Sequence, residues 1–257
     1  MTDSRRNFLK AALAGAGAAA LSGCTRLSQK PWVQDALGEV ENLTRRVQRV
    51  FAGGHALATE YKKSDIAPVF RANGTLNPST DEYAAHAATG FRNWRIAVGG
   101  LVEKPLSLSL DDLQAMPART QITRHDCVEG WSCIGEWTGV PLAPVLAAAR
   151  PKPEARYVMF FCADPMGNLP SGEAAYYYES LDLLEATHPQ TILAYRLNGQ
   201  VLPIEHGAPV RLRAERQLGY KMAKYIQRIE LVENFHRFAG GKGGYWEDQG
   251  YSWYAGI

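Results

Sequence analysis

The sequence predicts a single strand-rich α+β domain, and three observations lead to this prediction. The chain has 257 residues, 46% of them hydrophobic and 21% charged, which suffices for one domain with a well-buried core. From residue 94 onward, short apolar or alternating runs are separated by turn residues, as in β-strands. No internal repeat or low-complexity linker interrupts this part. The formal net charge is +2 and no basic stripe with interleaved aromatic residues occurs, so we expect no nucleic acid partner.

Residues 1–24 predict an export signal. Arg5 and Arg6 precede a short apolar run, rich in Ala and Gly, which is the twin-arginine signal pattern. The run ends in LSGC, residues 21–24, which is similar to a bacterial lipobox with Cys24 as the lipid-carrying residue. This signal is typical of proteins that bind a cofactor before export. We therefore expect a periplasmic protein, exported by the twin-arginine route, with membrane contact through a lipid anchor at Cys24.

Residues 25–52 are expected to contain an N-terminal helix. Its apolar positions recur at steps of three and four between residues 32 and 51, namely at Val33, Leu37, Val40, Leu43, Val47 and Val50. Residues 53–91 are expected to form a long irregular loop, because Asn, Gly and Pro residues mark its centre. A loop of this length inside a compact domain usually lines a site.

The remaining elements follow in order along residues 94–257. Residues 94–102 predict two strands joined by a Gly-Gly turn, and residues 109–115 predict a helix with Ser109 as its N-cap. Residues 121–127 predict a strand, and the apolar run 157–162 predicts a buried strand. A short helix is expected over 180–186, and a hairpin over 192–203 with its turn at Asn198 and Gly199. Strands are expected over 208–213 and 224–232, before a tail rich in Gly and aromatic residues.

Cys127 ends one predicted strand, in the segment RHDCVEGWSC. The neighbouring Cys and His residues lack the paired spacing of a structural zinc site, and no CxxC redox pair or CxxCH haem motif occurs. Three alternatives stay open on the residues alone. Cys127 could form a disulfide in an oxidising compartment, act as a nucleophile with His125 or His206 as base, or be an inert buried cysteine.

Residues 202–231 collect basic side chains around Gly207 and Gly219. These side chains are His206, Arg211, Arg213, Arg216, Lys221 and Lys224. Phosphate groups are bound by such charges together with exposed backbone N–H groups. A solvated basic face is the common alternative. The charges here alternate with apolar strand positions and turn glycines, which favours a pocket.

Three blocks of the chain are similar to the molybdopterin-binding domain of the sulfite oxidase family. They are CVEGWS…EWTGVPL, LNGQVLPIEHGAPVRL…GYKMAKYI and YWEDQGYSWYAGI, and the resemblance covers most of residues 70–257. It implies a strand-rich, mixed-sheet sulfite-oxidase-type molybdopterin-binding fold, with the oxidoreductase domain over residues 53–257. It also implies molybdenum-molybdopterin as the cofactor, which carries the chemistry while the protein orients it.

The resemblance assigns roles to single positions. Cys127 matches the cysteine whose thiolate ligates molybdenum, a soft ligand for a metal already held by sulfur. Arg71 and Tyr251 match residues at the substrate end of the pocket. The positions that match cofactor-binding residues are Asn73, Cys162, His206, Arg211, Met222, Ala223 and Lys224. Of these, Met222, Ala223 and Lys224 match the turn that grips the cofactor's phosphate.

The segment after Cys127 departs from the sulfite oxidase pattern. Glu129, Trp131 and Ser132 stand where sulfite oxidases place arginines, and the block is similar to that of periplasmic methionine-sulfoxide reductases. The expected activity is two-electron oxygen-atom transfer on a small sulfur-containing substrate, as sulfite oxidation or as S-oxide reduction. The chain has no haem or iron–sulfur ligand set, so we expect a cytochrome c or a membrane haem protein as electron partner. The alternative is a non-catalytic, cofactor-bearing or structural periplasmic lipoprotein.

Overall fold

The computed structural model describes residues 30–51, 56–168 and 174–257. The predicted signal peptide and Cys24 lie outside the described residues. The chain divides into two units, residues 1–51 and 52–257. The described part of the first unit is helix α2 (Pro31–Phe51), at the expected position, with Val40, Leu43 and Val50 exposed on its apolar side. Within the three described ranges, no helix is both long and apolar enough to cross a membrane.

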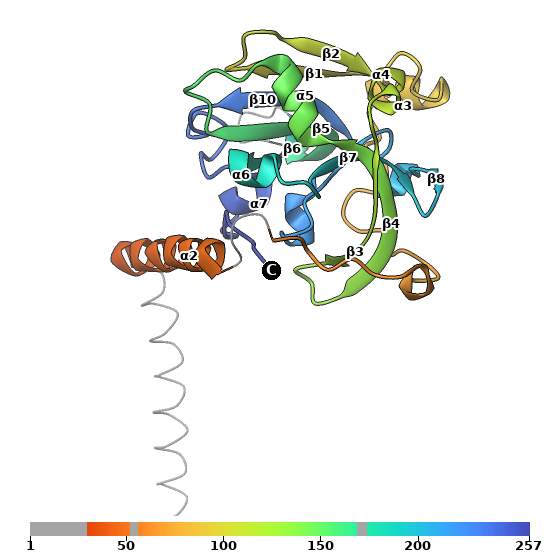
Figure 1. Ribbon diagram of the computed structural model, residues 1–257. Helices are drawn as coiled ribbons and strands as arrows, with labels where there is room; N and C mark the ends of the chain where they lie inside the picture. The colour runs from red at the N-terminus through yellow and green to blue at the C-terminus, as the bar shows by residue number, and fades with distance from the viewer. Residues whose placement is uncertain (1–29, 52–55, 169–173) are drawn as a thin grey trace, which may run out of the picture. The chain divides into compact units, whose positions relative to one another are not determined.

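The second unit contains two β-sheets (Figure 1). The first has the order β2-β1-β10-β5-β6 and consists of β1 (Arg95–Gly100), β2 (Leu106–Ser109), β5 (Tyr157–Asn168), β6 (Ala174–Asp182) and β10 (Ile226–Val232). The second has the order β3-β4-β7-β8, with β9 also paired to β7, and consists of β3 (Arg119–Asp126), β4 (Ser132–Pro141), β7 (Ile192–Leu197), β8 (Gln200–Val201) and β9 (Arg211–Arg213). β1 and β10 are parallel and the other pairs are antiparallel. The predicted strand-rich, mixed-sheet α+β fold is confirmed.

Short helices connect these strands. The α-helices are α3 (Asp81–Ala88), α4 (Leu110–Ala115), α5 (Leu142–Ala149), α6 (Leu183–Ala186) and α7 (Tyr245–Asp248), and the 3-10 helices are η1 (Lys63–Asp65), η2 (Ile204–His206) and η3 (Gly219–Lys221). Ser109 caps α4 as predicted, because its side chain accepts a hydrogen bond from the Asp112 backbone N–H. The predicted hairpin is also present, and its turn residues Asn198 and Gly199 both have positive φ, as a two-residue hairpin turn requires.

The structure differs from the sequence-based expectations in three details. The loop expected over 53–91 contains α3, which begins after the N-cap Thr80 and has Asp81 and Glu82 in its first turn. Gly99 and Gly100 end β1 rather than forming a turn, and the antiparallel partner β2 begins only at Leu106. Strands β4 and β6 and helix α5 have no counterpart among the predicted elements.

Within its described residues, the second unit has three clusters of buried apolar residues, and two of them position the loops that concern the site. The main core joins residues of both sheets and α5, including Ile96, Leu146 and Phe160. The smaller core lies on the second sheet, where the Phe70 ring packs edge-on against Trp137 with their centroids 5.1 Å apart. The Ala67 N–H donates to the Ile134 carbonyl at 3.0 Å. These contacts hold the loop that carries Arg71 and Asn73 against β4.

The C-terminal segment is fastened to β6 by polar contacts. Asp248 of α7 accepts hydrogen bonds from the Gly240 and Lys242 N–H groups and from the Tyr178 hydroxyl. Trp253 Nε1 donates to the Ser180 hydroxyl at 2.8 Å. The residues that follow α7 are therefore held at a defined place in the unit.

Candidate active site

A cavity of about 200 Å³ collects most of the predicted site residues. Those that line it are Arg71, Asn73, Cys127, His206, Arg211, Met222, Lys224 and Tyr251. They come from the loop before α3, the end of β3, η2, the start of β9, the segment between η3 and β10, and the C-terminal segment. Cys162 and Ala223 do not belong to the lining: both are buried in the main core. A side-chain contact of Cys162 with the cofactor therefore finds no support in this geometry.

Cys127 directly follows β3 and is half-buried at the cavity wall. Its N–H donates to the Trp131 carbonyl at 2.9 Å and its carbonyl accepts from the Gly130 N–H at 3.0 Å, so a tight turn fixes its backbone. Asn73 Nδ2 donates to the Cys127 Sγ at 3.4 Å. The contact holds an amide N–H donor against the sulfur from the loop before α3.

The alternatives for Cys127 can now be narrowed. Cys127, Cys133 and Cys162 are all free cysteines, so the alternative of a disulfide between any two of them is excluded. Among the described residues, no hydrogen bond joins the Cys127 thiol to a histidine, and no cluster of three His, Cys, Asp or Glu side chains forms a metal site. The contact with Asn73 at a cavity wall is instead suited to a single thiolate ligand for a metal whose other ligands come from a cofactor.

Arg211 lies at the inner wall of the cavity and is only 5% exposed. Its guanidinium donates to the carbonyls of His206 and Met222 at 3.1 and 3.2 Å, while its Nε has no partner in the described part of the chain. Burial and the nearby Arg213 charge lower the Arg211 pKa to about 9. A buried cation with a free donor and a second cation beside it is a strong site for an anionic group.

Lys224 bridges two loops across the cavity. Its Nζ donates to the carbonyls of Asn73 and Glu205 at 2.8 and 3.0 Å, and also to that of Thr75. Burial and the Arg211 charge lower the Lys224 pKa to about 7. Gly207 is needed beside it, because a Cβ there would lie 2.9 Å from the Lys224 Cβ and the residue has φ 109°. An anion in the cavity would restore the full charge of Lys224.

The other members of the predicted basic cluster serve buried ion pairs. Arg213 pairs with Glu215, and Arg216 pairs with Glu185. Lys221 contacts two buried carboxylates, Glu179 of β6 and Glu247 of α7. Arg213, Arg216 and Lys221 are not among the lining residues. The prediction that the six basic residues surround one pocket was therefore wrong for these three, because each of them pairs with a buried glutamate instead.

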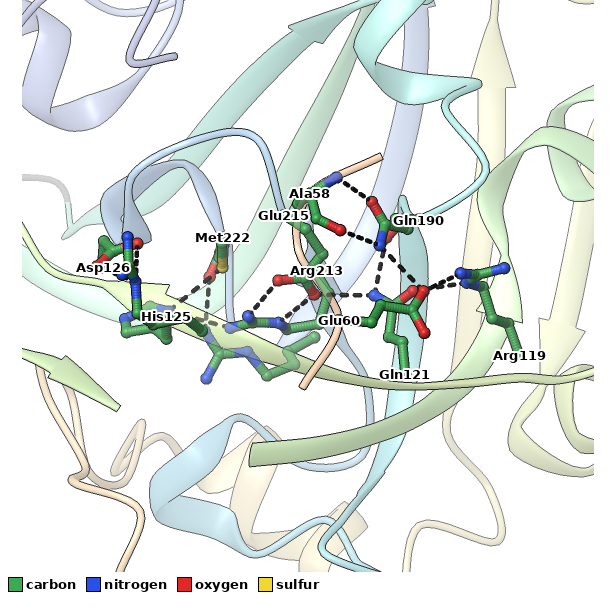
Figure 2. A network of polar contacts seen from close by, with 12 residues as sticks. Ala58, Glu60, Arg119, Gln121, His125, Asp126, Gln190, Arg213, Glu215 and Met222 are labelled. Carbon is green, nitrogen blue, oxygen red and sulfur yellow. Dashed lines mark hydrogen bonds and ion pairs between the residues drawn. The ribbon is translucent and has the colours of Figure 1, made fainter. Parts of the chain in front are cut away.

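A buried polar network missed by sequence reasoning reaches the cavity through His125 (Figure 2). Arg213 Nη1 contacts His125 Nδ1 at 3.0 Å and binds the Glu215 carboxylate through two nitrogens at 2.9 and 2.6 Å. Gln121 continues the network, with its Nε2 donating to Glu215 at 2.8 Å. Burial, followed by the Arg213 and Arg211 charges, lowers the pKa of His125 well below its ordinary value. Burial and the two arginine charges thus favour the neutral form of His125.

Asp164 is a lining residue that sequence reasoning missed. It lies on β5, is 4% exposed, and its Oδ1 has no hydrogen-bond partner among the described residues. Burial raises the Asp164 pKa to about 6, against smaller opposing contributions that include the Lys224 charge and a hydrogen bond from Thr75. Its only sequence signal was a charged residue directly after an apolar strand.

The cavity mouth carries aromatic and charged side chains. The Arg71 guanidinium lies 4.8 Å from the centre of the Trp131 ring, and Trp131 Nε1 donates to the Glu129 carboxylate at 3.1 Å. Tyr251 is 39% exposed and stacks on Trp246 with their ring centres 5.2 Å apart. All of these side chains line the cavity, so its outer part combines one cation, one carboxylate and three flat rings.

The residues present fit a molybdopterin. The Cys127 sulfur stands at one wall, and a buried arginine with an unpartnered Nε faces the same cavity from another. With a cofactor bound, Cys127 would hold the metal, while Arg211 and Lys224 would hold the anionic portion. The cofactor would supply two-electron redox chemistry, and the chain would orient it and shape access to it.

Comparisons with known proteins agree with this fit. The model of the oxidoreductase molybdopterin binding domain matches residues 84–238. The chain is 38% identical over 253 residues to YedZ1 of Azospira oryzae, named as a proposed protein-methionine-sulfoxide reductase subunit, covering 98% of this chain and 88% of that protein. It is 34% identical over 250 residues to MsrP of Ralstonia nicotianae, a protein-methionine-sulfoxide reductase catalytic subunit. That alignment covers 90% of this chain and 69% of that protein.

Among solved structures, the sulfane dehydrogenase SoxCD of Paracoccus pantotrophus is similar with a TM-score of 0.48 and 27% identity, covering 56% of this chain and 39% of that chain. The family model covers more than half of the present chain, and the two relatives align along most of it. The chain therefore belongs to the oxidoreductase molybdopterin-binding domain family, of sulfite oxidase type, and it is a molybdopterin-dependent oxidoreductase.

Proposed function

We propose that this protein reduces the S-oxide of a small, uncharged sulfur compound. In this reaction the S=O bond breaks, the sulfur takes up two electrons to become a thioether, and the oxygen leaves with two protons as water. The observation that carries this proposal is the Glu129–Trp131 pair at the cavity mouth. A carboxylate there repels a sulfite dianion, while an indole ring offers an apolar surface to a thioether.

The neighbouring side chains suit the same substrate class. Arg71, stacked on Trp131, is placed to donate hydrogen bonds to the oxygen of an S=O group. Tyr251 supplies a hydroxyl from the C-terminal segment, and its ring is held by stacking on Trp246. Arg71 and Tyr251 are thus the residues that we assign to the substrate, while Cys127, Arg211 and Lys224 are assigned to the cofactor.

The two relatives named above support the direction of the reaction. YedZ1 of Azospira oryzae and MsrP of Ralstonia nicotianae both carry names that refer to protein-methionine-sulfoxide reductase. We extend this to the present chain as a proposal, with a separate haem protein, a cytochrome c or a membrane haem protein, as the electron donor. The chain itself has no CxxCH haem-attachment motif.

A two-way assay with artificial mediators tests the proposal. The purified molybdenum-loaded enzyme receives reduced viologen with methionine sulfoxide or dimethyl sulfoxide, and in parallel ferricyanide with sulfite. We expect S-oxide-dependent viologen oxidation and no sulfite-dependent ferricyanide reduction. Turnover of sulfite with no S-oxide reduction would refute the proposal. Glu129→Gln serves as a matched variant: removing the carboxylate should leave S-oxide turnover largely unchanged.

We also propose export by the twin-arginine route and a lipid anchor at Cys24. These proposals rest on Arg5 and Arg6 before the apolar run and on the LSGC segment. Changing both arginines to lysine should retain the protein in the cytoplasm, as measured by cell fractionation. Cys24→Ala should release an exported protein from the membrane fraction. Efficient export without the arginine pair would contradict the proposed route.

A further inference from the structure

His125 occupies an unusual place for a histidine. It is the penultimate residue of β3, two positions before Cys127, and is 6% exposed, yet it lines the cavity. Its ring is surrounded by Trp131, with centroids 5.5 Å apart, Phe70 at 5.9 Å, and the Met222 sulfur at 3.4 Å from Nδ1. The imidazole therefore packs beside the turn that follows Cys127 and beside Met222, which belongs to the turn predicted to bind the cofactor's phosphate.

The Arg213 contact fixes the tautomer of this histidine. An arginine side chain can only donate, so the 3.0 Å contact between Arg213 Nη1 and His125 Nδ1 makes Nδ1 the acceptor. A neutral imidazole that accepts at Nδ1 carries its hydrogen on Nε2. Glu215 in turn binds Arg213 through two hydrogen bonds, and both side chains are fully buried. The network in Figure 2 thus holds one tautomer of His125 in one orientation.

The Nε2–H group has no protein acceptor among the described residues. It lies next to Gly219, another lining residue, where a Cβ would be only 2.4 Å from both Cε1 and Nε2. A side chain at position 219 would therefore displace the donor end of the ring. The absence of a side chain there leaves this end of His125 open beside the cavity.

We propose that His125 is a further cofactor-binding residue, which donates a hydrogen bond from Nε2–H to an acceptor atom of the molybdopterin. Arg213 is its positioning residue and keeps the hydrogen on Nε2. The inference uses only the family's cofactor, so it stands independently of the direction or substrate of the reaction. It adds a neutral donor to the charged contacts of Arg211 and Lys224.

Two substitutions of His125 separate this role from a structural one. In His125→Asn, the amide oxygen can still accept from Arg213, but no donor reaches the cavity. In His125→Gln, the longer side chain can place its amide N–H near the position of the imidazole Nε2. Thr123→Val is the matched control, because Thr123 is buried on the same strand two residues earlier and does not line the cavity.

The readout is molybdenum and pterin bound per folded chain, measured after purification under limiting cofactor supply and again after prolonged dialysis. We expect Thr123→Val and His125→Gln to retain the cofactor as the wild type does, and His125→Asn to retain roughly 3–10-fold less, as expected for one lost neutral hydrogen bond. Thermal unfolding of each cofactor-free protein checks that the fold is intact.

Cofactor retention by His125→Asn equal to that of the wild type overturns the proposal. Equal loss in folded His125→Asn and His125→Gln also overturns it, because the donor would then not be what matters. If His125→Gln does not fold, the comparison of His125→Asn with Thr123→Val decides. Sulfoxide turnover plays no part in this test, so its outcome is separate from that of the proposed function.

Discussion

Replacing Asp164 by Asn should stabilise the cofactor-free protein at neutral pH. The Asp164 carboxyl is buried, its Oδ1 has no partner among the described residues, and its pKa is raised from 3.8 to about 6 by burial. Each factor of ten in this proton affinity corresponds to about 1.4 kcal/mol, so ionising Asp164 in the folded state costs roughly 3 kcal/mol. Asn is neutral at every pH and avoids this cost.

The sign of the pH dependence follows from the raised pKa. Between pH 3.8 and about 6 the Asp164 carboxyl is mostly protonated in the folded protein but mostly ionised in the unfolded chain. Its stabilising contribution is complete below pH 3.8 and is lost as the pH rises through about 6. The variant lacks this contribution, so the difference in unfolding free energy between Asp164→Asn and wild type should grow from near zero at about pH 3.5 to roughly 3 kcal/mol at about pH 7.

Urea unfolding of both cofactor-free proteins at several pH values measures this difference. Thr75→Val provides a directional check, because it removes the Thr75 hydrogen bond, which favours the ionised carboxylate. Without this hydrogen bond the Asp164 pKa should be higher still. The unfolding free energy of Thr75→Val should therefore continue to fall up to a higher pH than that of the wild type. A difference between Asp164→Asn and wild type that does not change with pH would refute the reasoning.

Three further predictions concern the cofactor and the buried charges. Cys127→Ser should abolish the molybdenum electron paramagnetic resonance signal of the wild type while the protein stays folded; an unchanged signal would contradict its role as metal ligand. Arg211→Ala should lower molybdenum per chain about ten-fold under limiting supply, whereas Arg71→Ala should leave metal content intact and raise KM or lower kcat. Lys221→Met should cost about 3–5 kcal/mol in urea unfolding, because it leaves two glutamates buried without their cation; a loss below about 1 kcal/mol would contradict this.

Local patterns were sufficient to predict much of the fold. Ser109 and the Asn198–Gly199 pair act within four residues of their own position, as N-cap and as hairpin turn, and both were found as predicted. The limits of the strands were less predictable. Gly99 and Gly100 lie in β1 because Gly100 pairs with Leu231, more than a hundred residues later. A pairing at that distance leaves no signal in the local pattern.

The residues of the candidate site also differ in how far the sequence alone could predict them. Cys127, Arg211 and Lys224 were found through the resemblance of whole blocks, and the cavity brings them together. The basic residues Arg213 and Lys221 looked like those of the pocket in sequence, but both bind buried glutamates instead, and those of Lys221 come from distant parts of the chain. Asp164 was missed, and His125 was considered only as a base for Cys127, for the same reason: a single histidine or aspartate acquires its role only from the side chains that the fold packs around it.

The contacts that fasten the C-terminal segment to β6 also fix one wall of the cavity. Trp246 and Tyr251 of this segment line the cavity, while Asp248 and Trp253 bind Tyr178 and Ser180 of β6. A chain truncated before Tyr245 would therefore lose two lining residues together with the contacts that hold them, although it would still contain Cys127, Arg211 and Lys224.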